Sequence, residues 1–184
     1  MKEDVLTKAN AFKDINELAL RGEIVIFGST YMSGFPFYDL INKSKLEHAV
    51  YNRSIEGLTI DEAIEIAQTC VADIKPSKVF LALGEEDSDD PHAAEKYTAL
   101  VNQLRALLPA AKFYLICLQS ESNYAIKFNQ NIAKLCDGKK VFRIEFAVSN
   151  LSQAALYKER FKELCRFFRS QSISFSDAFA MADI

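Results

Sequence analysis

The chain has 184 residues, 49% of them hydrophobic, which is enough to fill one core, so we expect a single domain over residues 1–184. Its formal net charge of −3 and the lack of any run of Lys and Arg argue against a general nucleic-acid binder. No stretch approaches the roughly 18 apolar residues of a membrane span, and residues 1–14 lack the apolar centre of a secretory signal. We expect a cytoplasmic protein whose partner is a small molecule or another protein.

The cysteines are widely spaced, without a CxxC pair and without neighbouring histidines. Such spacing does not indicate a zinc site, and without a secretory signal it does not indicate a disulfide framework. We therefore expect buried free thiols and no bound cofactor or metal. The residues concerned are Cys70, Cys117, Cys136 and Cys165.

The amino-terminal third predicts a helix, a buried strand and a sharp turn. Apolar side chains recur at helical spacing over residues 4–21, with Asp4 as the expected N-cap and Gly22 at the end. Residues 23–27 (Glu-Ile-Val-Ile-Phe) are typical of a strand and run directly into Gly-Ser-Thr. A short helix over residues 37–45 and a short strand over residues 48–51 are expected to follow.

The middle of the chain predicts a capped helix, a central strand and an acidic turn. Thr59 and Glu62 form a capping box for a helix that ends near Pro76, and residues 79–83 read as a strand buried on both faces. The acidic residues that follow, at 85–87 and 89–90, could suggest a site for a hard metal ion. We favour helix capping, because the Asp-Pro pair at 90–91 is typical of a helix start and the spacing fits no EF-hand loop.

The remaining residues continue the alternation of helix and strand. We expect helices over residues 92–108 and 122–136, a long last helix capped by Ser152, and a short amphipathic helix in the tail over residues 171–184. The intervening strands are expected over residues 113–118 and 141–146, the latter at a sheet edge because its apolar and charged residues alternate. Five strands alternating with helices predict an α/β fold, a three-layer doubly wound sandwich around a five-stranded parallel sheet.

Two motifs resemble those of the SGNH, or GDSL, family of esterases and acylhydrolases. Residues 28–36 (Gly-Ser-Thr-Tyr-Met-Ser-Gly-Phe-Pro) are similar to that family's "GDSxTxGFP" motif, and residues 52–59 are similar to its "NxxIxGxT" motif. The resemblance covers about residues 8–169 and implies a flavodoxin-like strand order 2-1-3-4-5. It also implies a crevice at the carboxyl ends of the strands, whose expected ligand-binding residues are Ser29, Thr30, Gly57, Gly84, Glu86 and Asn150.

The sequence departs from this family where the chemistry is done. Thr30 occupies the position of the nucleophilic Ser, and Glu86 replaces the Asn that donates an amide to the oxyanion. Ala147 and Asn150 are the best matches for the missing Asp and His, which in the family orient and provide the base. An ionised carboxylate has only acceptors, so Glu86 reverses the interaction that the family's Asn makes.

Two functional hypotheses follow from this pattern. The first is a pseudoenzyme that binds an ester, acyl or sugar ligand, or a protein partner, in the inherited crevice. The second is an ester hydrolase with a rearranged site, in which Thr30 is the nucleophile and Glu86 the base. We rank the first higher because the Ser, Asn, Asp and His positions are all altered. An unrelated α/β domain is a third possibility, which another strand order would establish.

Overall fold

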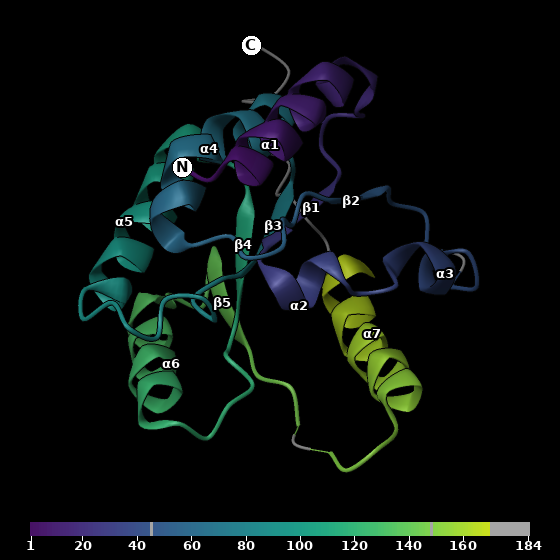
Figure 1. The fold of residues 1–184 in the computed structure, drawn as a ribbon. Helices are drawn as coiled ribbons and strands as arrows, with labels where there is room; N and C mark the ends of the chain where they lie inside the picture. The colour runs from purple at the N-terminus through teal and green to yellow at the C-terminus, as the bar shows by residue number, and fades with distance from the viewer. Residues whose placement is uncertain (45, 148, 170–184) are drawn as a thin grey trace.

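The fold is built on a parallel sheet, seen in a computed structural model that describes residues 1–44, 46–147 and 149–169. Its strands are β1 (Ile24–Gly28), β2 (Val50–Asn52), β3 (Lys78–Ala82), β4 (Lys112–Ile116) and β5 (Val141–Ile144). They lie in the order β2-β1-β3-β4-β5, and every neighbouring pair is parallel (Figure 1). This arrangement confirms the α/β sandwich and the strand order 2-1-3-4-5.

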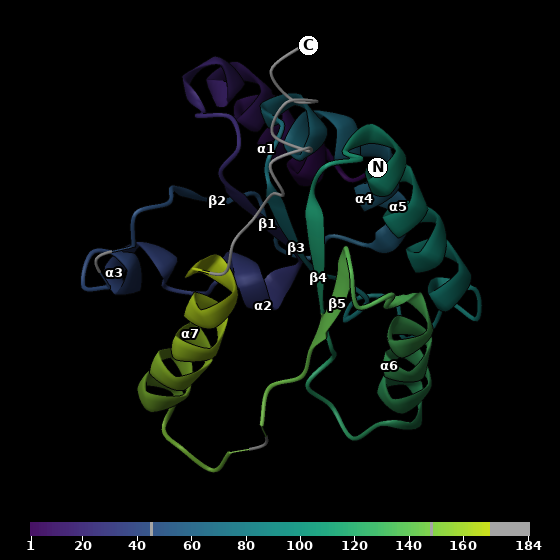
Figure 2. The ribbon, with the colours of Figure 1, turned by 180° about the vertical axis from the view of Figure 1, so that it is seen from behind.

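Helices cover both faces of the sheet, as the two opposite views show (Figures 1 and 2). They are α1 (Glu3–Ile15), α2 (Thr30–Ser33), α3 (Phe37–Ile41), α4 (Ile60–Cys70), α5 (Ala93–Leu107), α6 (Asn123–Leu135) and α7 (Gln153–Arg169), with single 3-10 turns at Asn16–Leu18 and Ala72–Ile74. One core packs α1, α4, α5 and α6 against the sheet, and the other packs α2, α3 and α7. The sheet is thus the middle layer of three.

The pleat of β1 explains why its sequence is apolar without a break. Val25 and Phe27 enter the first core, whereas Ile24 and Ile26 enter the second, and all four side chains are fully buried. Successive side chains of a strand point to opposite faces, so a strand with helices on both faces needs an apolar residue at every position. This burial holds the carboxyl end of β1, where the crevice begins, in a fixed place.

The expected helix caps are partly confirmed. The Thr59 and Glu62 capping box is present at the start of α4. Ser122, which was not predicted as a cap, also caps α6 by accepting a hydrogen bond from the Ala125 N–H. The strand β5 does lie at an edge of the sheet, with Arg143 exposed. Serine, threonine and acidic side chains satisfy free N–H groups at a helix start, which is why these boundaries were predictable.

The prediction for the leading helix is wrong at both ends. It begins after Lys2, whose backbone is extended, rather than after Asp4, and its regular turns end at Ile15 instead of residue 21. Leu18 is 76% and Leu20 62% exposed, so the last apolar residues of the pattern have no core to enter. Helical propensity without burial does not sustain a helix end.

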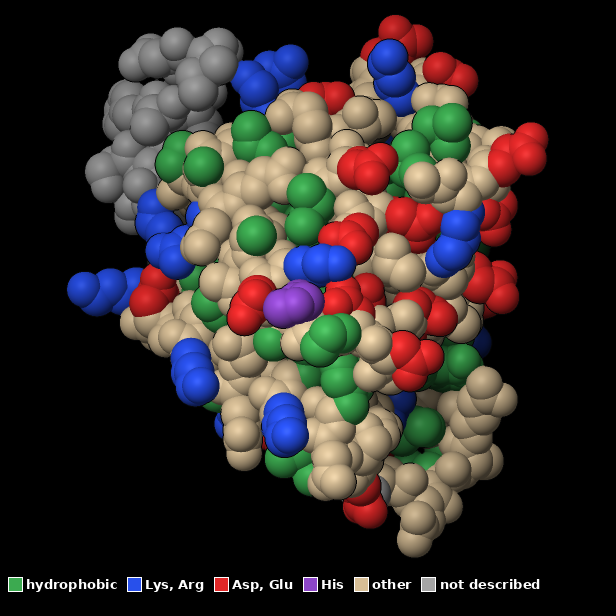
Figure 3. Space-filling view, turned by 60° about the vertical axis from the view of Figure 1, so that its left-hand side comes forward, with side chains coloured by type: hydrophobic (Ala, Val, Ile, Leu, Met, Phe, Trp, Pro, Cys, Tyr) green, Lys and Arg blue, Asp and Glu red, His purple; other side chains and the backbone are tan. Residues whose placement is uncertain are grey.

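The acidic turn after β3 also differs from the prediction. The helix α5 begins at Ala93, and Asp90 instead accepts a hydrogen bond from the His92 N–H in the turn before it. The Lys96 ammonium lies 2.5 Å from an Asp61 oxygen and 2.7 Å from an Asp90 oxygen, which draws α4, α5 and this turn together. Acidic and basic side chains are interleaved on the face that Figure 3 shows.

The cysteines are free, as expected, and three of them, Cys70, Cys117 and Cys165, are buried, while Cys136 is half-buried. Burial raises the pKa of the Cys70 thiol to about 12. Within the described ranges, no helix is long and apolar enough to cross a membrane. The expected helix in the tail lies outside the described residues.

Candidate functional site

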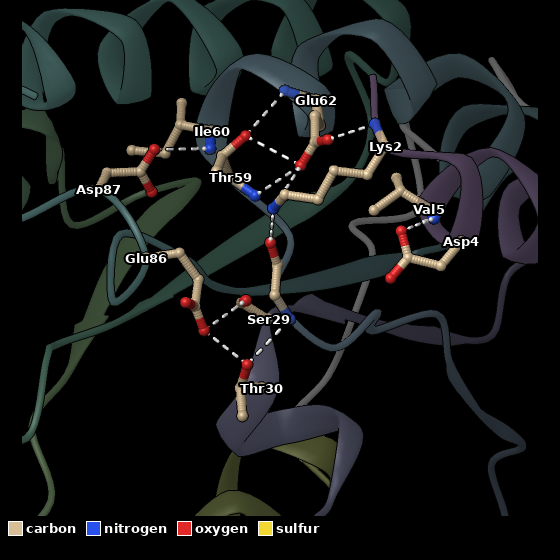
Figure 4. Close-up of polar contacts among 11 residues, drawn as sticks. Lys2, Asp4, Val5, Ser29, Thr30, Thr59, Ile60, Glu62, Glu86 and Asp87 are labelled. Atoms are coloured by element: carbon tan, nitrogen blue, oxygen red, sulfur yellow. Dashed lines mark hydrogen bonds and ion pairs between the residues drawn. The ribbon is translucent and has the colours of Figure 1, made fainter.

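Most of the residues predicted to line a crevice lie where β1 and β3 end, next to a cavity that Tyr31 and Glu85 line. The two strands are parallel neighbours with Gly28 opposite Ala82, so the turns that follow them emerge side by side. Ligand sites of open α/β sheets lie at this carboxyl edge. Thr30 opens α2 after β1, Glu86 stands in the turn after β3, and the Gly57 turn leads into α4, as Figure 4 shows for Thr30 and Glu86.

The Thr30 hydroxyl is the centre of a small hydrogen-bond network (Figure 4). Its Oγ1 donates to Oε1 of Glu86 at 2.5 Å and accepts the Gly57 N–H at 2.9 Å. The Ser29 hydroxyl donates to the same Glu86 oxygen at 3.4 Å. The carboxylate of Glu86 therefore lies over the position of the family's nucleophile, and the backbone donor of the Gly57 turn is engaged by a protein group.

The Gly57 turn is held in place by the amino terminus. Gly57 has a φ of +68°, a left-handed conformation that favours glycine, and this conformation turns its N–H toward Thr30. Lys2 Nζ donates to the Gly57 carbonyl at 2.5 Å and lies 3.3 Å from an oxygen of Glu62 on α4. The donor geometry at Thr30 thus depends on contacts from three separate segments.

The turn that carries Glu86 requires glycine for two reasons. Gly84 has a φ of +106°, and a Cβ at this position would come within 2.5 Å of the Phe128 ring. The Tyr124 hydroxyl donates to the Gly84 carbonyl at 2.7 Å. The Tyr124 and Phe128 side chains of α6 therefore fix the direction in which the backbone leaves β3 and positions Glu86.

Glu85 is a second carboxylate in the crevice, which the sequence prediction left out of the site. Its Oε1 accepts the Tyr31 N–H at 2.8 Å. Although much of the residue is exposed, desolvation of the carboxyl raises the pKa of Glu85, and the negative charge of Glu86 adds to this effect. Glu85 lines a cavity of about 360 Å³ together with Tyr31, Tyr124 and other residues that end β4 and start α6.

The structure brings five of the six predicted ligand-binding residues together, namely Ser29, Thr30, Gly57, Gly84 and Glu86. Asn150 is exposed in the connection between β5 and α7, and no hydrogen bond within the described residues joins it to this network. Whether these six residues bind a ligand stays a prediction.

No histidine contacts Thr30. The Nδ1 of His48 lies 3.2 Å from Glu23 beside β2, and that of His92 lies 3.2 Å from Glu95 on α5. These are the two histidines of the chain, so the described structure has no imidazole in the place of a general base.

The most informative residue that the prediction missed is Arg160 on α7. Its side chain extends from α7, which packs on the same face of the sheet as α2, and donates to the Tyr31 hydroxyl at 2.5 Å and to Gln119 Oε1 at 3.4 Å. The available signal was a charged residue in the apolar stripe that also contains Phe161 and Leu164, since positions three and four residues apart share a helix face. Among the described residues, no group of three His, Cys, Asp or Glu side chains could hold a metal ion.

No protein-family model and no curated protein matches the sequence. Solved structures do. A platelet activating factor protein from Streptococcus pneumonia has 16% identity and a TM-score of 0.76, over 90% of this chain and 93% of that one. A GDSL-like lipase from Bacteroides thetaiotaomicron VPI-5482 has 11% identity and a TM-score of 0.64, over 86% and 97%. The psychrotrophic esterase EstA from Pseudoalteromonas sp. has 16% identity and a TM-score of 0.65, over 81% and 100%.

The fold is therefore that of the GDSL, or SGNH, lipases and acylhydrolases. The order of the five parallel strands agrees with this class. At these identities the likeness describes the backbone and not the chemistry, because one fold can hold many different sites.

Proposed function

We propose that this chain is a binding relative of the GDSL esterases that keeps their crevice and lacks their hydrolytic chemistry. The observation that carries the proposal is the hydrogen bond that the Thr30 hydroxyl donates to the Glu86 carboxylate. The family's Asn at the Glu86 position donates an amide to the oxyanion, whereas a carboxylate has only acceptors. Its negative charge would repel the oxyanion that an ester forms on attack.

The Gly57 turn supports the same proposal. In the family, the N–H of this glycine donates to the oxyanion, but here it donates to Thr30 Oγ1 at 2.9 Å. Removing one oxyanion donor from a protease costs about 2.7–4 kcal/mol, or roughly 100-fold to 1000-fold in turnover. A hydrolase with this site would lack the Asn donor and would have to release the Gly57 donor from Thr30.

The two positions between β5 and α7 that best match the family's Asp and His supply no base. Ala147 and Asn150, the positions that best match the family's Asp and His, are both exposed, and Ala147 has no titratable group. A hydroxyl nucleophile is weak unless an adjacent base removes its proton. The described residues offer Thr30 only the carboxylate of Glu86 for this task.

The cavity beside the network has the size of a small-ligand pocket and both apolar and hydroxyl-bearing residues on its wall, and we propose an ester, acyl or sugar group as its occupant. Its volume of about 360 Å³ lies within the usual range of ligand pockets, and hydroxyl groups of Tyr31, Tyr124 and Ser88 line it. One structural neighbour is a carbohydrate esterase whose active site displays divergent catalytic and non-catalytic binding functions, and another is a two-domain esterase active on acetylated mannans. A protein partner is the alternative occupant.

A second candidate function has one specific observation in its favour. The separation of 2.5 Å between Thr30 Oγ1 and Glu86 Oε1 is the contact that a nucleophile makes with its general base. An ester hydrolase that uses Thr30 and Glu86 is therefore the alternative. We rank it lower because the same carboxylate that activates the hydroxyl would oppose the oxyanion.

Steady-state assays with acetyl and butyryl aryl esters from pH 6 to pH 9 test the proposal. We expect the wild-type protein and Thr30→Val to hydrolyse these esters at the same background rate. In a protease triad, removal of the nucleophile or of the base alone lowers turnover roughly a million-fold. Turnover by the wild type that disappears in Thr30→Val would overturn the proposal and establish the alternative.

A further inference from the structure

Arg160 is a buried cation whose acceptors are all neutral. Its residue is 9% exposed, and its guanidinium lies 5.0 Å from the Tyr31 ring centroid and 5.3 Å from that of Phe146. Its two hydrogen bonds go to the Tyr31 hydroxyl and to the amide oxygen of Gln119. The buried Nε has no partner within the described residues.

No carboxylate oxygen of a described residue lies within 4.0 Å of the Arg160 guanidinium, which distinguishes it from the exposed Arg143 and Arg105. Arg143 pairs with Glu145 at 3.2 Å and Arg105 pairs with Asp137 at 3.3 Å. A buried charge costs free energy unless an opposite charge or enough hydrogen bonds compensate it. The two aromatic rings offset part of this cost, and an anion would offset more.

Burial alone does not distinguish Arg160, because Arg53 is 2% exposed and also lacks a carboxylate partner among the described residues. The Arg53 guanidinium, however, donates to the main-chain carbonyl of Phe12 and lines neither of the two cavities at the carboxyl edge of the sheet. Arg160 does line one of them. The access that this cavity provides is what points to a ligand.

The cavity beside Arg160 has a volume of about 1070 Å³ and lies between α6 and the connection that leads from β5 to α7. It shares Leu118, Gln119 and Ser120 with the cavity that Glu85 lines. The charged side chains on its wall besides Arg160 are Glu121, Lys134, Arg143 and Glu145. The two cavities are thus neighbours.

Tyr31 joins the two neighbouring cavities, which together form the crevice considered below: it lines the cavity of Glu85 and contacts Arg160 on the wall of the other. Its N–H donates to the Glu85 carboxylate and its hydroxyl accepts from the Arg160 guanidinium. Carboxylates therefore stand at the Thr30 end, and an uncompensated cation stands at the other. A ligand that spans the crevice would bring a neutral or hydroxyl-rich part to the first end and a negative group to the second.

We infer that Arg160 recognises an anionic group, a carboxylate or a phosphate, on the ligand that binds in this crevice. The planar guanidinium matches the oxygen pairs of both groups and can donate two parallel hydrogen bonds to either. This inference rests on the proposed binding function and names the chemical class of its ligand. The Tyr31 and Phe146 rings hold the guanidinium at the wall of the cavity before the ligand arrives.

The test is a titration of the ¹⁵N-labelled protein with sodium phosphate and, separately, sodium acetate, with sodium chloride replacing each salt at constant ionic strength. The Nε–H signal of Arg160, assigned by its loss in Arg160→Lys, is expected to shift and to saturate with at least one of the two anions. Once the signal is assigned, the titration itself is read from the wild-type protein. Tighter binding of phosphate supports a phosphorylated ligand, and tighter binding of acetate supports a carboxylate.

Two variants locate the site. Arg160→Met is expected to bind the anion about 10-fold to 100-fold more weakly, the range of a charge-assisted hydrogen bond. Arg143→Met is the matched control, because Arg143 lines the same cavity but is exposed and paired with Glu145. It should change the affinity by less than about threefold. The absence of a saturable shift in the wild type, or an equal loss in both variants, would overturn the inference.

The two proposals can fail separately. Ester turnover that depends on Thr30 would overturn the non-catalytic function, and the anion titration at Arg160 would be unaffected by that result. Failure to bind either anion would refute the inference about Arg160. The ester assays would still show whether Thr30 supports hydrolysis.

Discussion

Gly84→Ala tests how the acidic turn that presents Glu86 is held. The substitution adds one methyl group at a residue with a φ of +106°, where an L side chain is strained. The new Cβ would lie 2.5 Å from one carbon of the Phe128 ring and 2.7 Å from another. Phe128 cannot move aside freely, because its ring packs against Tyr97 at 5.1 Å and Tyr124 at 5.6 Å between centroids.

The expected cost has two parts. A positive φ in a non-glycine residue costs on the order of 1–3 kcal/mol, and forcing an extra methyl into a packed core costs about 1–3 kcal/mol. Together these predict a loss of about 2–6 kcal/mol, a large share of the roughly 5–15 kcal/mol by which a domain is stable. At about 2–4 °C for each kcal/mol, the Tm should fall by about 4–24 °C.

Thermal and urea unfolding followed by circular dichroism would measure this loss. Gly138→Ala is the matched control, since Gly138 has a φ of +68° but no atom within 4 Å of the place that an added Cβ would take. It should lose only the backbone cost of about 1–2 kcal/mol. If Gly84→Ala is no less stable than Gly138→Ala, then Phe128 does not pack against this turn as described, and the turn that carries Glu86 is not held rigidly by α6.

Two further predictions concern the chemistry of the crevice. Glu85→Gln should raise the Tm at pH 7 and not at pH 4. The pKa of Glu85 is higher in the folded protein than in the unfolded chain, so the folded state favours the protonated carboxyl. The stability that this preference contributes is present below the pKa of the unfolded chain and is lost as the pH rises through the pKa of the folded protein, and a neutral Gln avoids that loss. The same comparison for Glu65→Gln, on the exposed face of α4, controls for the loss of a charge, and an equal gain in Tm of Glu85→Gln at both pH values would contradict the reasoning.

Restoring the family's residues as a set should create weak ester hydrolysis that partial sets lack, because residues acting as a unit contribute non-additively. Assays of folded variants, with the last two placements also tried at neighbouring residues, would decide this, and a complete absence of turnover would mean that the crevice has been reshaped. The set is Ser29→Asp, Thr30→Ser, Glu86→Asn, Ala147→Asp and Asn150→His.

Much of the fold could be predicted because local patterns and burial agree. The unbroken apolar run of β1 predicts a strand covered on both faces, and the capping box at Thr59 predicts the start of α4. The end of α1 was not predictable from periodicity, since the exposure of Leu18 and Leu20 depends on where the neighbouring elements end. Asp90 failed as an N-cap because its carboxylate is used in the preceding turn and by Lys96.

The candidate site was predictable in its location and only partly in its contacts. Strand order places the turns after β1 and β3 together, so the approach of Glu86 to Thr30 follows from topology. The roles of Glu85 and Arg160 do not, because they depend on side-chain directions and on how α7 packs across the sheet. A buried guanidinium without a carboxylate partner is a three-dimensional property, and the sequence shows it only as a charge in an apolar stripe.

The proposal that this chain lacks hydrolytic chemistry is tested most directly by measuring whether Thr30 reacts as a nucleophile. Intact-protein mass spectrometry after exposure to an alkyl fluorophosphonate, which labels activated hydroxyl nucleophiles, would measure this, with an active serine esterase as the positive control. The account predicts that this protein keeps its unmodified mass while the control is labelled. A single phosphonyl adduct that maps to Thr30 and is absent from Thr30→Val would contradict it.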